Sequence, residues 1–194
     1  MKTLLILMLA LICITLKKMY FFQTNNMLMY EMLVSAIPSL VLSLQPNTDR
    51  VKGKFIPFVL SRAIPGALTM TIGIMAVYLI HASSLAETFG FVQNMETPSY
   101  NALMMIALTA CGLVMLYRIC QPFNTVRAVL WVIAVCMCAI VLAVPTLGNF
   151  VFNGWDALTF TVPQILLMII IVQASYPISG FLIKAFDMIN PADE

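Results

Sequence analysis

Charged residues are scarce in this chain of 194 residues. Only 9% of the residues are Asp, Glu, Lys or Arg, whereas 62% are hydrophobic. A soluble domain carries about 25% charged and about 45–50% apolar residues, because its surface must interact with water. The composition therefore excludes a soluble globular fold and predicts an integral membrane protein embedded in the lipid bilayer. The formal net charge is only +2, so neither a nucleic-acid-binding surface nor an acidic tail is indicated.

Residue types that build catalytic and metal centres are also scarce. The chain has one histidine, His81, and five cysteines that nearly all lie inside apolar stretches. Cys136 and Cys138 are two residues apart, so on a helix they point about 200° away from each other and do not favour a shared metal ion. The sequence shows no Ser/His/Asp set, phosphate-binding glycine loop, zinc-type cysteine pair or dinucleotide-binding fingerprint. No catalytic or cofactor-binding residue is predicted, and we interpret the cysteines as small packing residues.

Long apolar stretches predict an all-α fold class, a polytopic bundle of about six transmembrane helices that forms a single domain over residues 1–194. About 20 apolar residues are needed to cross the hydrocarbon core. The first stretch imitates a secretory signal, but no small-residue cleavage site follows, so we expect an uncleaved span that Lys17 and Lys18 interrupt. The spans are predicted at residues 3–21, 27–44, 60–80, 101–117, 127–145 and 159–183.

Basic residues between the spans predict the orientation of the bundle. When the chain crosses the membrane at each predicted span, eight of the ten basic residues fall on one side. The opposite side has only Lys17 and Lys18, together with the acidic Glu87, Glu96 and Asp156. Basic residues are enriched in cytoplasmic loops, so both termini and the 45–62 connection are predicted to be cytoplasmic. The eight basic residues on that side are Lys2, Arg50, Lys52, Lys54, Arg62, Arg118, Arg127 and Lys184.

Polar residues in the second predicted span form a candidate cation path. Pro38 has no N–H, so in an α-helix it frees the carbonyl of Val34. That carbonyl and its neighbours at Ser35, Pro38 and Ser39 can present oxygen to a hard metal cation. Ordinary packing between helices explains the same residues, and the sequence leaves both readings open. The polar residues recur every four positions and form one slowly turning stripe on a helix: Glu31, Ser35, Ser39 and Ser43.

Weaker polar signals lie in the third and last predicted spans. Gly66 and Gly73, with Thr69 between them, predict close contact with another helix. Gln164 and Gln173 either line a path or bridge helices, and we favour bridging.

The connection between the second and third spans concentrates positive charge. Arg50, Lys52, Lys54 and Arg62 crowd this segment, and only Asp49 offsets them. The charges can hold the loop at anionic lipid headgroups and fix the orientation. Alternatively, they can dock a cytoplasmic domain. Both roles remain open.

Three runs around the second and third spans resemble a known family. They are Ser35-Ala-Ile-Pro-Ser-Leu-Val-Leu-Ser-Leu-Gln-Pro-Asn47, Arg50-Val-Lys-Gly-Lys-Phe55 and Val59-Leu-Ser-Arg-Ala-Ile-Pro-Gly-Ala-Leu68. They resemble the bacterial cation-transporting P-type ATPases of the E type. That family shows an Ile-Pro-Ser-Phe-Phe-Leu-Ala-Leu-Glu-Pro-Asn pattern, a basic Arg-x-Lys-Gly-x-Phe connection and an Ala-Leu-Pro-Gly helix start. The resemblance is dense over residues 31–70; Gln45 departs from it, because an acidic residue is common there.

This resemblance implies that the spans correspond to the fifth to tenth membrane helices of such a pump in the bacterial cell membrane. Pro38 and Ser39 match the Pro-Ser of the sixth helix, and Pro65 with Gly66 matches the start of the seventh. The family's Asp-Lys-Thr-Gly-Thr, Thr-Gly-Glu and Gly-Asp-Gly motifs are absent from this sequence. The chain is therefore expected not to be an enzyme alone, and ATP and Mg²⁺ are implied only for the complete pump. Its amino-terminal ATPase domains are then partners, in the same or a separate chain, and calcium is the favoured cation.

Three functions remain open at this point. The chain can be the carboxy-terminal membrane portion of the pump, as a fragment, a frameshift product or a separately encoded half. It can instead be a free-standing six-span channel or secondary transporter that uses the polar stripe. A non-catalytic membrane subunit that scaffolds a partner is the third hypothesis.

Overall fold

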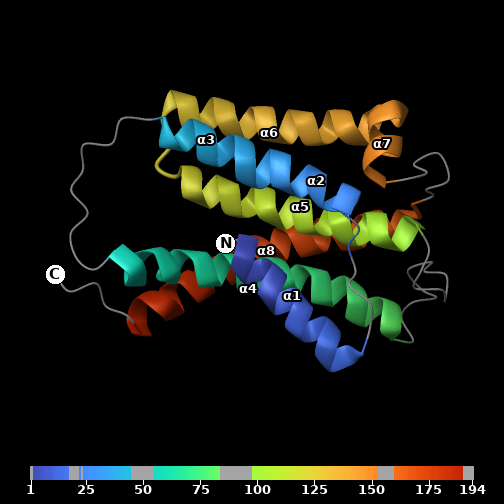
Figure 1. Cartoon of the computed structure of the whole chain (residues 1–194), viewed down its shortest axis with the longest axis horizontal. Coiled ribbons are helices and arrows are strands. Elements are labelled where there is room, and N and C mark those ends of the chain that lie inside the picture. Colours follow the sequence, from blue (N-terminus) through green and yellow to red (C-terminus); the bar gives the residue numbers. More distant parts are fainter. Residues whose placement is uncertain are drawn as a thin grey trace.

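The computed structural model describes residues 2–17, 22, 24–44, 55–83, 98–152 and 160–189, and every regular element among them is a helix (Figure 1). In chain order the elements are α1 (Lys2–Leu16), α2 (Thr24–Tyr30), the π-helix η1 (Glu31–Ala36), α3 (Ile37–Ser43), α4 (Phe55–Ala82), α5 (Pro98–Cys120), α6 (Thr125–Ala143), α7 (Pro145–Phe152) and α8 (Val162–Ile189). The all-helical prediction is confirmed for these residues.

Four helices are long and apolar enough to cross a membrane, which supports a multi-pass membrane protein. They run over Arg62–Ala82, Tyr100–Cys120, Thr125–Ala143 and Val162–Met188, where the last four predicted spans lie. The first two predicted spans fall on shorter apolar helices, Thr3–Leu16 and Met27–Ser43. At 1.5 Å per residue, the 15 residues of α1 extend only about 22 Å, less than the hydrocarbon core. The number six therefore stays a prediction.

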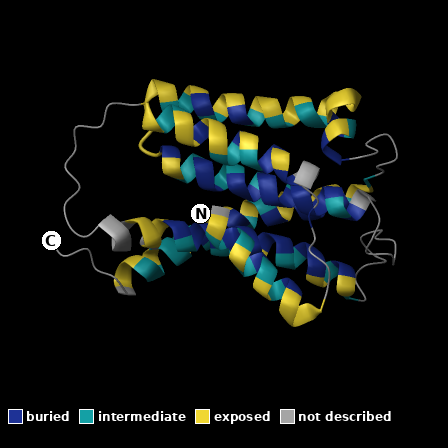
Figure 2. Cartoon of the chain, in the orientation of Figure 1, coloured by how far each residue is buried: buried dark blue, intermediate teal, exposed yellow. Residues whose placement is uncertain are grey.

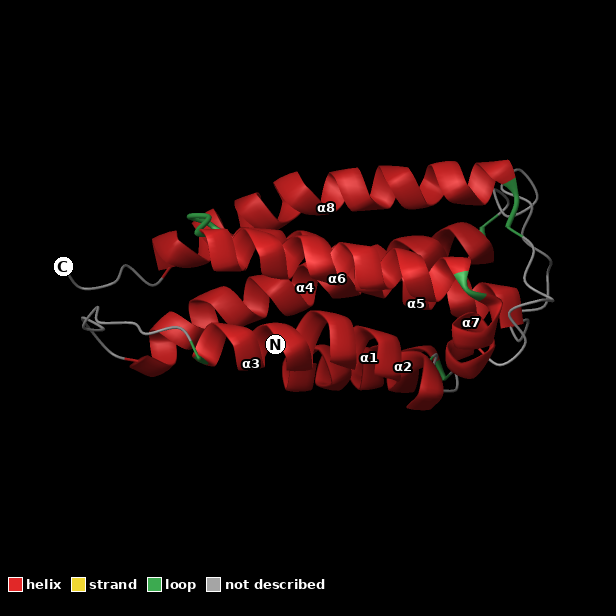
Figure 3. Ribbon diagram, turned by 90° about the horizontal axis from the view of Figure 1, so that it is seen from above, coloured by secondary structure: helices red, strands yellow, loops and turns green. Residues whose placement is uncertain are grey.

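The centre of the bundle consists of α4, α5 and α8, which pack against one another. Helix α1 packs on α4, while α2 and η1 pack on α5, and η1 and α3 also contact α6. Seen from above, α8 lies on one face of the bundle and α1 to α3 lie on the opposite face (Figure 3). The core between them is built from long apolar side chains, including Met70, Ile74, Met104 and Leu108, none of which is more than 1% exposed.

Apolar side chains also cover much of the outer surface. On α6, Val132 and Ile133 are each about half exposed, and on α8 Ile169 and Ile170 are similarly exposed (Figure 2). Exposed apolar area costs free energy in water at roughly 25 cal/mol per Å². A surface of this kind suits lipid rather than water.

Small residues and local hydrogen bonds explain several predicted features of the helices. A Cβ atom at Gly73 would lie 2.8 Å from Cys111 Sγ, so the predicted close approach of helices occurs there, between α4 and α5. Gln164 closes the first turn of its own helix, because the Thr161 backbone N–H donates to Gln164 Oε1 at 3.0 Å, in the manner of a capping box. Pro65 lies inside α4, ten residues after its first residue, and not at the helix start that the resemblance suggests.

Basic side chains gather at one end of the bundle. Arg62 lies near the start of α4, Arg118 in the last turn of α5, Arg127 near the start of α6 and Lys184 near the end of α8. These four helix ends lie on the same side of the bundle (Figure 1). Helix α1 begins well inside the bundle and runs toward the other end, where Lys17 follows it. Lys18, Arg50, Lys52 and Lys54 lie outside the described residues.

Candidate functional site: a cleft beside an interrupted helix

Residues 24–43 form one continuous helical path whose middle is a π-helix. The Ile37 N–H donates to the carbonyl of Met32, five residues back, where an α-helix would use the carbonyl four residues back. The sequence predicts a regular α-helix here, so the wider turn is a difference from that expectation. Its physical reason is Pro38, whose ring crowds the carbonyl four residues earlier in an α-helix; a wider turn just before the proline relieves this contact.

The wide turn and the proline together reduce the number of backbone donors. In a helix the carbonyl of Leu33 would accept from Ile37 or from residue 38. Ile37 donates to Met32 instead, and Pro38 has no N–H. Fewer backbone N–H groups are therefore available to donate hydrogen bonds to the carbonyls of Leu33 and Val34 than in a regular helix. Such carbonyls are tolerated in a membrane only where they face protein or a polar cavity.

A cleft of about 270 Å³ opens beside this turn, and we call it the Pro38 cleft. The four residues of the predicted cation path, Val34, Ser35, Pro38 and Ser39, all line it. A buried water requires only about 10–15 Å³ of such volume, so the cleft has room for several waters or a partly hydrated cation. Its remaining lining residues are Tyr30, Leu42, Met70, Gly112, Met115, Leu116 and Ile119.

Only part of the predicted polar stripe lines the Pro38 cleft. Ser35 and Ser39 line the Pro38 cleft, whereas Glu31 and Ser43 do not. Glu31 lies one turn before Ser35, and Ser43 lies one turn after Ser39, about 6 Å further along the helix axis, so the cleft reaches only the middle two residues of the stripe. Glu31 is half-buried at the start of η1, and Ser43 is exposed near the end of α3.

The two serine hydroxyls on α3 make the same local contact in different surroundings. Ser39 Oγ donates to the carbonyl of Ala36 at 3.0 Å, and Ser43 Oγ donates to the carbonyl of Leu40 at 2.8 Å. Each hydroxyl donates its proton to this carbonyl, and its oxygen lone pairs can still accept a hydrogen bond or coordinate a cation. Of these two residues only Ser39 lines the Pro38 cleft, so Ser43 is a matched control for it.

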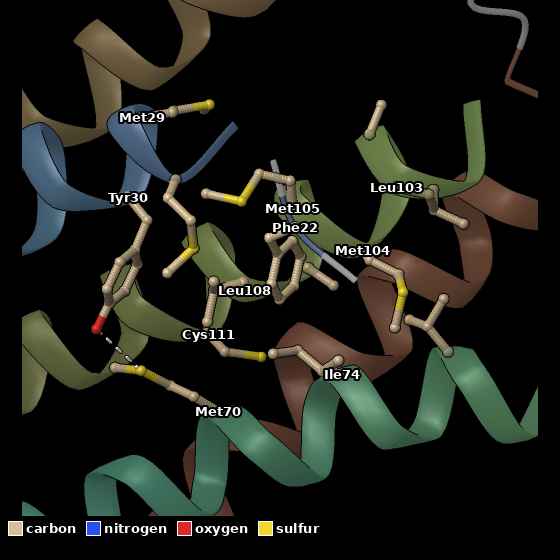
Figure 4. Packing of buried hydrophobic residues seen from close by; sticks show 14 of the residues in the cluster. Phe22, Met29, Tyr30, Met70, Ile74, Leu103, Met104, Met105, Leu108 and Cys111 are labelled. Atoms are coloured by element: carbon tan, nitrogen blue, oxygen red, sulfur yellow. Dashed lines mark hydrogen bonds between the residues drawn. The ribbon is translucent and has the colours of Figure 1, made fainter. Parts of the chain in front are cut away.

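Tyr30 is a lining residue that the sequence reasoning missed. Its side chain is only 2% exposed, and its hydroxyl donates to Met70 Sδ at 3.4 Å, across from α2 to α4 (Figure 4). The phenol therefore adds another oxygen at the wall of the cleft. Its position four residues before Val34 is the signal that could have revealed it, because residues i and i+4 share a helix face.

Gly112 lets the interrupted helix approach α5 closely. A Cβ atom at this position would lie 2.8 Å from Val34 Cγ1 and 3.1 Å from Tyr30 Cε2. Any side chain at residue 112 would push Val34 and Tyr30 away. The glycine thus positions two of the residues that line the Pro38 cleft.

The chemistry of the cleft is neutral. Its lining has hydroxyl and carbonyl oxygens but no charged side chain, and the described part of the chain holds no cluster of three His, Cys, Asp or Glu residues that could bind a metal tightly. Neutral oxygen ligands suit a hard cation that binds weakly and moves on.

His81, at the far end of α4, packs against Tyr100 with ring centroids 4.4 Å apart.

The predicted basic connection is described only at Arg62. Its Nη2 lies 3.7 Å from Asp187 Oδ2 of α8, and both side chains are about half exposed. Arg50, Lys52 and Lys54 lie outside the described residues, so neither proposed role of that connection is tested.

Comparison with known proteins gives no match: no protein family, no curated protein and no solved structure matches this chain. The resemblance to cation pumps therefore rests on the sequence runs quoted above and stays a prediction. The function of the Pro38 cleft must be argued from its own geometry.

Proposed function

We propose that this chain is a multi-pass membrane protein that provides part of a cation path at the Pro38 cleft. The observation that carries the proposal is the shared lining of this cleft by Val34, Ser35, Pro38 and Ser39, at the end of the π-turn and directly after it. Transporters bind cations where membrane helices are broken, because unpaired carbonyls there replace water around the ion. Interrupted backbone, hydroxyl groups and free volume occur together at this point of the bundle.

The cation path is best explained as part of a pump driven by ATP hydrolysis outside this sequence. The pattern that resembles the sixth membrane helix of P-type ATPases includes Pro38 and Ser39, which line the cleft. On this proposal the chain forms the carboxy-terminal membrane domain of the pump in a bacterial cell membrane, with calcium as the favoured cation. ATP and Mg²⁺ bind to the amino-terminal domains, and the chain alone hydrolyses no ATP.

The proposed topology has six spans with both termini in the cytoplasm. The gathering of Arg62, Arg118, Arg127 and Lys184 at one end of the bundle supports it, because basic residues favour the cytoplasmic side. The 20 residues of α2, η1 and α3 give the second span enough length if the bilayer thins locally. Accessibility tags at residues 90 and 153 should report the outer face, and cytoplasmic labelling at either position contradicts this topology.

Binding and flux measurements on the purified chain separate the three functions. A pump membrane domain should bind Ca²⁺ in calorimetric titration but carry no passive flux in liposomes loaded with a calcium dye. A free-standing channel or secondary transporter should bind Ca²⁺ and also admit it. A scaffolding subunit should neither bind Ca²⁺ nor admit it. If the chain also neither binds nor admits Na⁺, K⁺ and Mg²⁺, the cation path is contradicted.

A double variant tests the site itself. Pro38→Ala with Ser39→Ala restores one backbone N–H and removes one hydroxyl oxygen, so cation binding should weaken more than tenfold. Ser43→Ala should leave it unchanged, because Ser43 has the same local hydrogen bond but lies outside the cleft. Equal affinity in the double variant and the unaltered chain would assign these residues to helix packing alone.

A further inference from the structure

A second cleft lies at the end of the bundle where the basic side chains gather, and we call it the basic cleft. It has a volume of about 610 Å³ and lies among the start of α4, the end of α5 and the end of α8. Two guanidinium groups, those of Arg62 and Arg118, line it together with apolar side chains that include Val59, Ile119 and Ile183. Neither arginine lines the Pro38 cleft, although Met115 and Ile119 line both clefts.

Arg118 is held in a fixed position against α8. Its Nη2 donates to the carbonyl oxygen of Tyr176 at 2.6 Å, and its Cζ lies 4.2 Å from the centroid of the Tyr176 ring. A Cβ atom at Gly180 would lie 2.6 Å from the same Nη2, so the guanidinium reaches α8 because residue 180 is glycine. The Nε atom of Arg118 is buried and has no acceptor among the described residues. The group is therefore positioned but not neutralised by a carboxylate at hydrogen-bond distance.

Arg62 faces the same cleft and is only weakly paired. Its partner Asp187 lies 3.7 Å away, and the two side chains are 53% and 46% exposed. An ion pair this exposed is weak, so an incoming anion can compete with it. Two arginines around one cleft provide the planar sets of N–H donors that bind phosphate oxygens.

We propose that the basic cleft binds the phosphate group of an anionic phospholipid. Arg62 and Arg118 contact the phosphate, and the apolar wall contacts the first part of an acyl chain. The charge of the cleft is complementary to that phosphate, and its position at the end of apolar helices is where headgroups lie. Val59 and Ile119 are 43% and 46% exposed, so the apolar wall is open to a lipid chain. A free phosphate ion would leave this wall unused.

Lipid titration of the purified chain in detergent tests the proposal. Phosphatidylglycerol and phosphatidylcholine with identical acyl chains are added separately, and bound lipid is counted by native mass spectrometry. Phosphatidylglycerol should bind about tenfold more tightly, because phosphatidylcholine carries a compensating positive charge. Inorganic phosphate at millimolar concentration should not displace it. Displacement by phosphate at that concentration would assign the cleft to a free anion and overturn the lipid proposal.

Three variants locate the binding site. Arg62→Gln should lower phosphatidylglycerol affinity about fivefold, since a basic residue near the surface contributes about that much, and should leave phosphatidylcholine binding unchanged. Gly180→Ala should also lower it, because the added Cβ displaces the Arg118 guanidinium without changing the charge. Arg127→Gln is the matched control: it removes the same charge at the same end of the bundle but lies outside the cleft.

The outcomes do not depend on the cation path. Arg62→Gln should keep the cation affinity of the unaltered chain, so failure of one proposal is distinguishable from failure of the other. Equal affinity for both lipids, or an equal loss in Arg127→Gln and Arg62→Gln, would overturn the basic cleft as a lipid site. If Gly180→Ala does not fold, the comparison of Arg62→Gln with Arg127→Gln still distinguishes the outcomes, because the Arg62 side chain is exposed and the Arg127 side chain is partly exposed.

Discussion

Pro38 and Pro65 are both buried inside helices, and both lack a backbone N–H, yet their surroundings differ. Before Pro38 the helix widens into the π-turn at residues 31–36, and the residues around it line the Pro38 cleft. Pro65 lies within α4, which continues as an α-helix from Phe55 to Ala82. There the hydroxyl of Thr69 donates to the Pro65 carbonyl at 2.8 Å, and Thr69 is 1% exposed.

This difference shows that a proline in a membrane helix does not by itself create an ion path. Pro65 is less than 2% exposed, and its helix α4 packs against both α5 and α8. Pro38 lies on a helix at the side of the bundle, and free volume remains between that helix and α5. Both prolines lack a backbone N–H, and the packing around each proline decides whether a cleft opens beside it.

Filling the glycine contacts should give the largest effects and should separate the two regions. Gly112→Ala brings a Cβ to 2.8 Å from Val34 Cγ1, and Gly73→Ala brings one equally close to Cys111 Sγ. Overpacking of this kind costs about 1–3 kcal/mol, so both variants should unfold at lower temperature in detergent. Only Gly112→Ala should also weaken cation binding, by more than tenfold, because it displaces two residues of the cleft. Equal cation affinity in the two variants would show that the position of Val34 does not matter.

Replacing each proline tests the comparison directly. Pro38→Ala restores an N–H that can occupy a carbonyl of the cleft wall, and cation affinity should fall about tenfold, the value of one charge-assisted contact of about 1.4 kcal/mol. Pro65→Ala restores an N–H inside the core, so affinity should not change. Calorimetric titration with Ca²⁺ measures both. A loss of affinity in Pro65→Ala would mean that the two prolines act together and that the comparison is mistaken.

Removing the tyrosine hydroxyl should have a smaller effect. Tyr30→Phe keeps the ring between α2 and α4 but removes the oxygen that lies 3.4 Å from Met70 Sδ. If that oxygen takes part in binding, affinity should fall about threefold, which corresponds to about 0.6 kcal/mol. The unfolding temperature should stay within a few degrees of the unaltered chain. An unchanged affinity would restrict the site to η1 and α3.

The smallest effect is expected in the region of Pro65. Thr69→Val removes the hydroxyl bonded to the Pro65 carbonyl and keeps the side-chain volume. Hydrogen bonds of side chains within membrane bundles contribute about 0.6 kcal/mol on average, so stability should fall by about that amount. Cation binding should be unaffected. A change in cation binding would show that the path includes α4 and would contradict the proposed difference between the two prolines.

The sequence alone determined that the chain is helical and suited to a membrane, because composition and the length of apolar stretches depend on hydrophobicity and not on particular contacts. It also indicated the residues around Pro38, since a missing N–H is a property of proline wherever it occurs. The same rule applied at Pro65 and could not distinguish the two positions. The sequence left open whether the first two predicted spans cross the membrane, because their helices are too short for length alone to decide.

Tertiary structure alone decided which polar groups share a space. Ser35 and Ser39 line the Pro38 cleft and Glu31 and Ser43 do not, although all four lie on one stripe of an ideal helix. Tyr30 and Gly112 join the Pro38 cleft, and Gly180 positions Arg118 in the basic cleft, through contacts between helices far apart in the sequence. Such contacts depend on how helices pack, within a few ångströms, and periodicity along one helix carries no information about the neighbour that faces it.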